Sequence, residues 1–343
     1  MTSTAPYGYR IVGSCENNRL LINWGAAFLA YSECDNRAEI EREAYLSAFT
    51  FGADFRELLK STGTPRGFAG ACGSPWLWFD IDRDGNLDLA TLDARRLAAS
   101  LVERYRLDGD ELLLFFSGSK GYHAGLPLAL CGSPGPSAAF HSICRQLAER
   151  LAELAGVAVD ASVYDRVRAF RAPNSRHPKT GLHKRRLSFD ELLHLKTDVI
   201  LRLAAEPLPF DLPEPPAPSD RAKADWNESS EAVERSHAAH QERRANGTAK
   251  LTRSTMSFIR DGAGTGDRHR LLFSAAANLA EFGCPPALAH ALLTDAGLDS
   301  GLPPSDVRRQ IDCGLQHRNA KDSPCQQNTT PLPTYSTDGA MNC

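Results

Sequence analysis

The sequence predicts an α+β region followed by a smaller all-α unit. Apolar runs such as Trp76–Phe79 and Leu112–Phe116 have the length and aromatic content of buried strands. Between and after them, residues 92–105 and 136–155 carry apolar side chains at the spacing of amphipathic helices. Prolines and charged residues then separate these elements from a last stretch, residues 267–317, in which apolar positions recur at helical spacing alone.

The composition shifts along the 343 residues predict four segments. We expect an α+β domain over residues 1–204, in which residues 1–10 form a loose leader. A linker, rich in proline and then in charge, should cover 205–253. A helical domain over 254–318 and a disordered polar tail over 319–343 should complete the chain.

Composition narrows the classes of function. The formal net charge is only −3, so any affinity for a polyanion must come from a local basic patch. No apolar run approaches the roughly 18 residues that cross a bilayer, and no basic segment leads into an apolar one at the N-terminus. The nine cysteines form no C-x-x-C pair, which argues against a zinc knuckle or a disulfide framework. We therefore expect a cytoplasmic protein with reduced thiols and no membrane partner.

The end of the first strand carries two acids, Asp80 and Asp82. Side chains on a strand alternate between its faces, so these carboxylates should share a face about 6.6 Å apart, measured between Cα atoms. Bare charges at that distance repel by roughly 2.5 kcal/mol at an effective dielectric constant of 20, and a cation between them would relieve the repulsion. Two solvated acids at a turn are the alternative interpretation. Carboxylate oxygens are the ligands that Mg²⁺ and Mn²⁺ prefer.

The residues that follow imitate a calcium-binding loop when they are counted from Asp80. Acids stand at positions 1, 3 and 5 and Gly85 at position 6. Position 12, where a bidentate Glu is needed, is Thr91, and the preceding segment is a strand instead of a helix. A tight turn that leads the chain into a helix is therefore the better interpretation.

The second strand ends in a polar loop, Ser117–His123, with the sequence SGSKGYH. Two glycines in a short loop permit close backbone approach and expose N–H groups. Lys120 and His123 add a cation and a further donor beside two hydroxyls. A generic Gly-Ser turn would explain the glycines, but the set as a whole suits a nucleoside triphosphate.

A third acid, Asp160, ends the apolar run Val157–Val159, which we expect to form another short strand. Asp165 is its rival as a third ligand, and we prefer Asp160 because Asp165 lacks such a run before it. The dense basic stretch that follows is either a solvated face or a contact for polyphosphate or a nucleic-acid backbone. Its members are Arg166, Arg168, Arg171, Arg176, Lys179, Lys184, Arg185 and Arg186.

Together and in this order, the motifs Asp80-Ile81-Asp82, Ser117–His123, Val159-Asp160 and Ser175–Gly181 (SRHPKTG) resemble those of the archaeo-eukaryotic primase superfamily, the primase-polymerases. That family carries a D-x-D/E strand, an S-G-x-x-G-x-H loop and a later hydrophobic residue followed by Asp, and its small-subunit primases also carry S-x-H-P-K-T-G. The resemblance covers about residues 70–195. The helical stretch near the C-terminus is similar to the domain that follows the catalytic domain in phage and plasmid primases. The zinc-binding stem of many relatives has no counterpart here.

The resemblance implies an RRM-like sheet with flanking helices and catalysis by two Mg²⁺ or Mn²⁺ ions. It also implies the role of each matched residue. The catalytic metal ligands would be Asp80, Asp82 and Asp160; the residues around the incoming triphosphate would be Ser117, Ser119, Lys120, His123, Ser175, His177 and Lys179; and Arg171 and Arg176 would contact phosphate or template.

The function that follows is template-directed nucleotidyl transfer by a DNA primase, which makes short primers on single-stranded DNA from NTPs or dNTPs. A replicative helicase is a further partner that the resemblance suggests. Two alternatives stay open: a repair polymerase that fills gaps without priming, and a non-catalytic replication initiator or DNA-binding protein with the same fold. The residues do not distinguish ribose from deoxyribose, and they indicate no role for residues 1–60.

Overall fold

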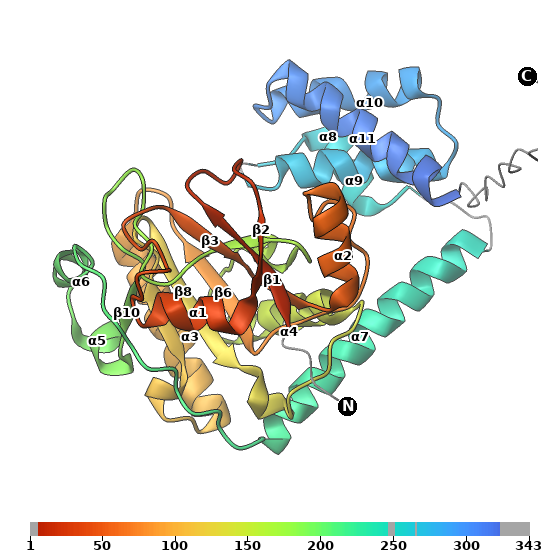
Figure 1. Cartoon of the computed structure of the whole chain (residues 1–343). Helices are drawn as coiled ribbons and strands as arrows, with labels where there is room; N and C mark the ends of the chain where they lie inside the picture. Colours follow the sequence, from red (N-terminus) through yellow and green to blue (C-terminus); the bar gives the residue numbers. More distant parts are fainter. Residues whose placement is uncertain (1–5, 246–250, 265, 323–343) are drawn as a thin grey trace, which may run out of the picture. The chain divides into compact units, whose positions relative to one another are not determined.

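The computed structural model describes residues 6–245, 251–264 and 266–322, and the chain divides into two compact units, Met1–Ala238 and Ala239–Cys343. The first unit combines two antiparallel sheets with helices, and the described residues of the second are helical (Figure 1). The predicted α+β class is thus confirmed. The two units are described separately below.

The first sheet is built largely from the N-terminal residues to which no role could be given. Its strand order is β5-β4-β1-β3-β9, and β2 also pairs with β1. The expected loose leader is wrong from Tyr7 onward, because β1 begins there and forms the centre of the sheet. The strands are β1 (Tyr7–Val12), β2 (Leu20–Asn23), β3 (Ala44–Ser47), β4 (Thr50–Phe51), β5 (Cys72–Gly73) and β9 (Ala169–Arg171).

The second sheet contains the two predicted strands and has the order β10-β7-β8-β6. Helix α3 connects β6 to β7, and β8 pairs with both, so β8 lies between two strands that run in the same direction. Strand β8 begins within the SGSKGYH segment, at Gly121. The bounds are β6 (Trp76–Asp82), β7 (Leu113–Phe116), β8 (Gly121–Pro127) and β10 (Arg185–Leu187).

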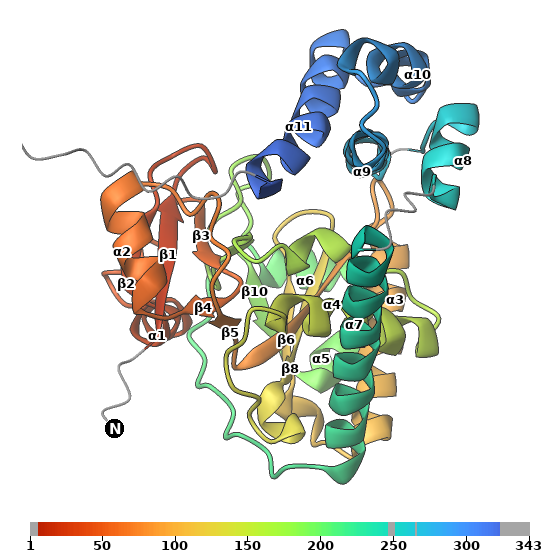
Figure 2. The same ribbon diagram turned by 90° about the vertical axis from the view of Figure 1, so that its right-hand side faces the viewer.

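Helices cover both sheets. Figure 2 shows α2 beside the first sheet and α3 and α4 beside the second, so that the sheets lie between them. The α-helices of this unit are α1 (Trp24–Ser32), α2 (Ala53–Thr62), α3 (Leu87–Tyr105), α4 (Phe140–Leu154), α5 (Phe189–His194), α6 (Thr197–Leu203) and α7 (Asp220–Ala245). Three single-turn 3₁₀ helices are η1 (Gly109–Glu111), η2 (Leu128–Cys131) and η3 (Ala161–Tyr164).

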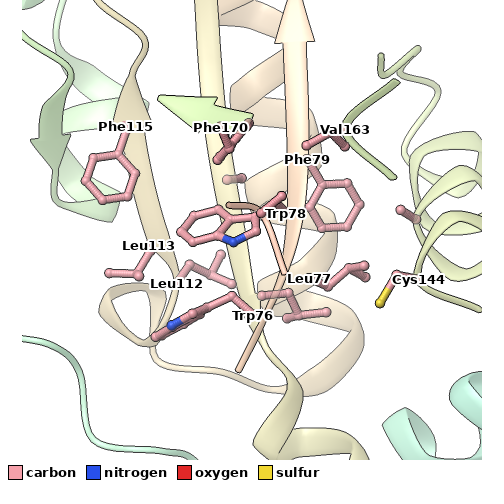
Figure 3. Close-up of a cluster of buried hydrophobic side chains, with 14 of the residues drawn as sticks. Trp76, Leu77, Trp78, Phe79, Leu112, Leu113, Phe115, Cys144, Val163 and Phe170 are labelled. Carbon is pink, nitrogen blue, oxygen red and sulfur yellow. The ribbon is translucent and has the colours of Figure 1, made fainter. Parts of the chain in front are cut away.

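Strand β6 forms the centre of the hydrophobic core. Figure 3 shows Trp76 and Trp78 on one side of it and Leu77 and Phe79 on the other, toward Cys144 of α4. The indole of Trp78 lies 5.4 Å from the ring of Phe170 on β9, measured between ring centroids, so the two sheets pack against each other here. Since side chains alternate, Asp80 and Asp82 belong to the same face as the two tryptophans.

The turn after β6 and the start of α5 follow from their local sequence. Gly85 has φ +72°, a backbone conformation in which L side chains are strained, and Asn86 then caps α3 by accepting a hydrogen bond from Leu89 N–H. The tight turn preferred over a calcium loop is therefore confirmed, although α3 begins at Leu87, earlier than predicted. Ser188 and Glu191 form the capping box that opens α5.

The prediction of a third short strand over residues 157–160 is wrong. These residues form no ladder, and a single backbone bond, from Asp160 N–H to the Asp80 carbonyl, joins them to β6 (2.9 Å). Asp160 instead caps η3 through its side chain. Among the described strands β6 is the last of its sheet, so its outer edge was available, but the run reaches it through this one backbone bond and adds no strand.

The segment expected to be a linker is in part an element of the first unit. Residues 205–219 have no regular secondary structure, but α7 follows and packs through Trp226 against Phe140 of α4. The carboxylate of Asp225 has an exposed fraction of 2% and bonds the guanidinium of Arg104 at 2.7 and 2.8 Å. Since the first unit extends to Ala238, its boundary lies well beyond the predicted residue 204.

The second unit contains the expected helices and one helix more. Its members are α8 (Arg253–Asp261), α9 (Arg268–Glu281), α10 (Pro286–Asp299) and α11 (Pro304–Asp322). Helices α9 and α11 approach closely at Gly314, where a Cβ atom would lie 2.6 Å from the Cβ of Ala276. Helix α11 includes residues 319–322 of the predicted disordered tail; the rest of that tail lies outside the described residues. None of the described helices is long and apolar enough to cross a membrane.

We expect Asp225→Ala to reduce the free energy of unfolding by about 3–5 kcal/mol, because it leaves the half-buried Arg104 guanidinium without its partner. Urea denaturation followed by circular dichroism measures the loss. Glu231→Ala is the control: Glu231 lies on the same helix, is 66% exposed and pairs only with Arg235, so its effect should stay within about 0.5 kcal/mol. Equal losses in the two variants would contradict the role of Asp225.

Candidate active site

The two acids of β6 face specific residues of the SGSKGYH loop, because β6 and β8 pair in register. Asp80 lies opposite His123, and Asp82 lies opposite Gly121. A Cβ atom at Gly121 would lie 2.1 Å from the Ile81 carbonyl oxygen and 2.4 Å from the Asp82 carboxylate. Only glycine therefore allows this approach. The pairing brings the first two predicted motifs to one end of the second sheet.

Asp80 is a buried acid among other acids. Burial, together with the charges of Asp82 and Asp160, raises the pKa of Asp80 to about 7, and the charges of Lys184 and Arg168 act in the opposite direction. Its Oδ1 lies 3.5 Å from Nε2 of His123 but accepts no hydrogen bond. A buried carboxylate oxygen without a donor is costly, so this atom is suited to an added cation.

His123 is itself buried and neutral. Burial lowers the pKa of its imidazole well below the ordinary value, and the charges of Lys184 and Arg171 lower it further. The ring stacks on Phe170 of β9, with 4.3 Å between centroids, and its Nδ1 has no hydrogen-bond partner. His123 therefore lies where the two sheets meet, and its Nδ1 is the atom without a partner.

The third acid, Asp160, lies beside Asp80, because its backbone N–H bonds the Asp80 carbonyl oxygen. Its charge is among the causes of the raised pKa of Asp80. Its own carboxylate, however, accepts hydrogen bonds from the N–H and the hydroxyl of Ser162, both at 2.8 Å. Asp165 is exposed and does not appear among the charges that shift Asp80. The structure therefore brings Asp160, and not its rival, to the acidic strand.

The acids are not arranged as a finished metal cage. Within the described ranges, no three His, Cys, Asp or Glu side chains form a group that could hold a metal ion. Asp82 instead lies 3.2 Å from Nζ of Lys120, which also bonds Asp84 at 2.7 Å. The ammonium group of Lys120 thus balances the charge of Asp82. Oδ1 of Asp80 is a second acceptor, and it has no hydrogen-bond partner. A metal ion held by Asp80, Asp82 and Asp160 therefore stays a prediction: one oxygen of Asp80 is free to accept, whereas the carboxylate of Asp160 is engaged as the cap of η3.

The SGSKGYH loop packs against the SRHPKTG loop. The hydroxyl of Thr180 donates to the carbonyl of Gly118 at 2.6 Å. Gly118 has φ +88°, and a Cβ atom there would lie 3.1 Å from the Leu182 carbonyl and 3.3 Å from the Cβ of His177. Two segments that are about sixty residues apart in the chain thus form one surface next to the acids.

The imidazole of His177 is oriented by its own loop. Its Nδ1 accepts hydrogen bonds from the backbone N–H groups of Lys179 and Thr180, both at 3.3 Å, so Nε2 carries the proton and is a donor. Lys179 itself is exposed. Ser175 does not join this surface: it is fully buried, and its hydroxyl donates to the Ala172 carbonyl at 2.8 Å. The buried Ser117 uses its N–H for the Gly121 carbonyl, and Ser119 is half-buried.

The two predicted arginines differ. Arg171 is half-buried on β9, stacks over the ring of Tyr45 and has one nitrogen, Nη1, that is buried without a partner. Its charge also lowers the pKa of His123 and His177, after burial, which is the larger cause for both. Arg176 is exposed and bonds the Gly181 carbonyl at 3.0 Å within its own loop. Arg171 belongs to the site, whereas Arg176 stabilises the loop beside it.

Comparisons with protein-family models, with curated proteins and with solved structures gave no significant match. The resemblance to primase-polymerases therefore rests on the sequence motifs alone and stays a prediction.

Sequence reasoning missed the importance of Lys184. It was one of eight basic residues in a run, yet its side chain is fully buried, and its Nζ donates to the Arg171 carbonyl at 2.8 Å. The ammonium lies 4.5–5.4 Å from the centroids of three rings, those of Trp78, Phe115 and Phe170. The charge of Lys184 acts to lower the pKa of Asp80. Arg185 and Arg186 of the same run are buried as well, so it is the place among these three rings that distinguishes Lys184.

We expect metal-free Asp80→Asn to be more stable than the wild type at pH 8 but to gain less at pH 5. The Asp80 carboxyl ionises near pH 4 in the unfolded chain and at about 7 in the folded one, so its contribution to stability declines as the pH rises between these values. A difference of one pKa unit corresponds to about 1.4 kcal/mol. Denaturant unfolding in a chelating buffer at both pH values measures the effect. Asp165→Asn, at an exposed acid, should show no such pH-dependent gain.

Proposed function

We propose that this chain is a template-directed nucleotidyltransferase of the primase-polymerase kind, which makes short primers on single-stranded DNA. The observation that carries the proposal is the convergence of three sequence motifs on one end of the second sheet. The acids of β6 lie opposite the SGSKGYH loop, and that loop contacts the SRHPKTG loop. If these acidic and basic residues had no catalytic use, we would not expect the fold to bring them together around polar atoms that lack hydrogen-bond partners.

The acidic side of the site suits divalent cations. Asp80 and Asp82 are the first ligands, since they share a face of β6 and one oxygen of Asp80 is buried without a donor. Asp160 is the third ligand, and its backbone N–H, which bonds the Asp80 carbonyl oxygen, holds it beside the other two. Mg²⁺ or Mn²⁺ at these carboxylates would lower the pKa of an attacking hydroxyl and offset the charge of a leaving pyrophosphate.

The opposite side suits a triphosphate. Lys120 supplies a cation, and the protonated Nε2 of His177 supplies an oriented donor. Arg171 adds a guanidinium nitrogen that is buried and unpartnered, and Lys179 is exposed at the rim. Guanidinium, ammonium and imidazole donors around a Gly-containing loop form a cradle for phosphate oxygens. The NTP or dNTP would lie with its phosphates toward these groups and its α-phosphate toward the acids.

The reaction would be an in-line displacement at that α-phosphate. The 3′-hydroxyl of one nucleotide forms a new P–O bond, the bond to the β,γ-pyrophosphate breaks, and the hydroxyl proton is lost to solvent. The chain's own contribution is positioning: the loops hold the triphosphate, and the acids hold the side at which the hydroxyl attacks. The neutral imidazole of His123, stacked on Phe170, has a free nitrogen that can hydrogen-bond a phosphate oxygen.

We expect Asp80→Ala combined with Asp82→Ala to abolish Mn²⁺-dependent synthesis on a single-stranded template. Removing two ligands should reduce the rate by at least about 10³-fold, because the remaining acid cannot hold the ion pair. Dinucleotides and longer products are measured with radiolabelled nucleotide and no added primer. Asp165→Ala is the control and should retain synthesis. Full activity in the double variant would refute the proposal, and wild-type extension of supplied primers without dinucleotide formation would favour gap filling.

We expect Gly118→Ala to weaken nucleotide binding at least about tenfold, since its Cβ would press on the Leu182 carbonyl and separate the two loops. Gly85→Ala is a matched control, because Gly85 also has positive φ but nothing lies within 4 Å of its added Cβ. The rise in melting temperature on adding nucleotide with Mn²⁺ gives the affinity of each variant. A wild type without any metal-dependent rise would favour a DNA-binding protein without synthesis.

A further inference from the structure

The segment that carries Asp160 needs an anchor. Residues 157–160 belong to no strand or helix, and a single backbone bond joins Asp160 to β6. At its other end the N–H of Val157 bonds the Ala152 carbonyl at 2.9 Å, but that bond leads back to α4 and not to the acidic strand. The structure supplies a second attachment through Arg83, the residue that directly follows the acidic strand.

Arg83 connects three parts of the site with one guanidinium. Its Nη1 donates to the Asp82 carbonyl at 2.7 Å, and its Nη2 donates to the Ala158 carbonyl at 2.8 Å. Its Nε donates to Asp93 of α3 at 2.8 Å. The backbone N–H of Arg83 also bonds the Lys120 carbonyl at 3.3 Å. The residue therefore touches the acidic strand, the Asp160 segment, the covering helix and the SGSKGYH loop.

The contact with Asp93 makes this arrangement rigid. The carboxylate of Asp93 is 8% exposed and the side chain of Arg83 is 20% exposed, so both are held away from bulk water. A planar guanidinium whose Nε and Nη2 both meet one oxygen of a buried acid, at 2.8 and 2.6 Å, presents its remaining N–H groups in set directions. Arg96 also approaches Asp93, at 3.7 Å, but no contact joins it to Asp82 or Ala158.

We propose that Arg83 is a positioning residue, which holds the Asp160 segment against the end of β6 so that the third acid can join the first two around a divalent cation. The inference rests on the proposed function for the cation, but the positioning itself is a property of the metal-free chain. Outer partners that orient metal ligands commonly change metal affinity by about 10–100-fold when they are replaced.

The first test needs no metal. In metal-free Arg83→Gln, the Asp160 amide, which donates to the Asp80 carbonyl, should exchange its hydrogen at least about tenfold faster. Amides of β8 and α3 should change less than about twofold. Arg96→Gln is the matched control and should leave Asp160 protected, because Arg96 pairs with Asp93 and, within the described residues, no hydrogen bond joins it to Asp82 or Ala158. Unchanged exchange at Asp160, or an equal acceleration throughout the unit, would overturn the proposal.

The second test measures Mn²⁺ binding by titration calorimetry. Arg83→Gln should weaken binding by about 10–100-fold, and Asp160→Asn should cost much less in that background than in the wild type, because the two residues act through one segment. Additive losses would overturn the proposal. Should Arg83→Gln fail to fold, Arg83→Lys keeps the charge beside Asp93 but cannot bond both carbonyls, and the same outcomes apply. A wild type that binds no Mn²⁺ would refute the proposed function, while the exchange test would still decide the role of Arg83.

Discussion

The register between β6 and β8 is the constraint on which the site depends. Seven consecutive pairs, from Trp76↔Pro127 to Asp82↔Gly121, set Asp80 opposite His123. A slip of one residue would turn the acids to the face that carries the buried Leu77 and Phe79, and the tryptophans would have to fit there as well. Because Trp76 and Trp78 share the face of Asp80 and Asp82, hydrophobic burial at one end of the strand determines where the carboxylates lie at the other.

Burial at this strand end creates an electrostatic problem that the fold solves only in part. Asp80 lies close to two other acids in a region with little water, which raises its pKa to about 7. Two lysines offset this: Lys184, whose own pKa burial lowers well below the ordinary value, lies among aromatic rings, and Lys120 reaches Asp82 from the surface. Among the described residues of the site, Asp80 Oδ1, His123 Nδ1 and Arg171 Nη1 are buried without a hydrogen-bond partner. The polar network at this strand end is therefore incomplete in the chain by itself.

Features of the structure could be predicted from the sequence where the residues that determine them are close together in the chain. The strands ending in Asp82 and Phe116 and the turn at Gly85 arise from neighbours within a few residues, and they were found. The supposed strand before Asp160 was not there, because a three-residue apolar run says nothing about whether an edge is free to pair. Ser175 fitted a motif, yet its hydroxyl is taken by the backbone. No sequence pattern indicated the burial of Lys184 or the three contacts of Arg83.

The sequence by itself determined the identity of the chemical groups and the elements that carry them: the acids at a strand end, the glycine-containing loop, and the basic stretch that follows. Patterns of this kind reflect periodicity and steric rules that act over a few residues. Only the tertiary structure decided which acid accompanies Asp80, which hydroxyls and cations stay free, and which lysine lies beneath the site. These outcomes depend on desolvation and on partners that are distant along the chain, so they arise only when the two sheets pack together.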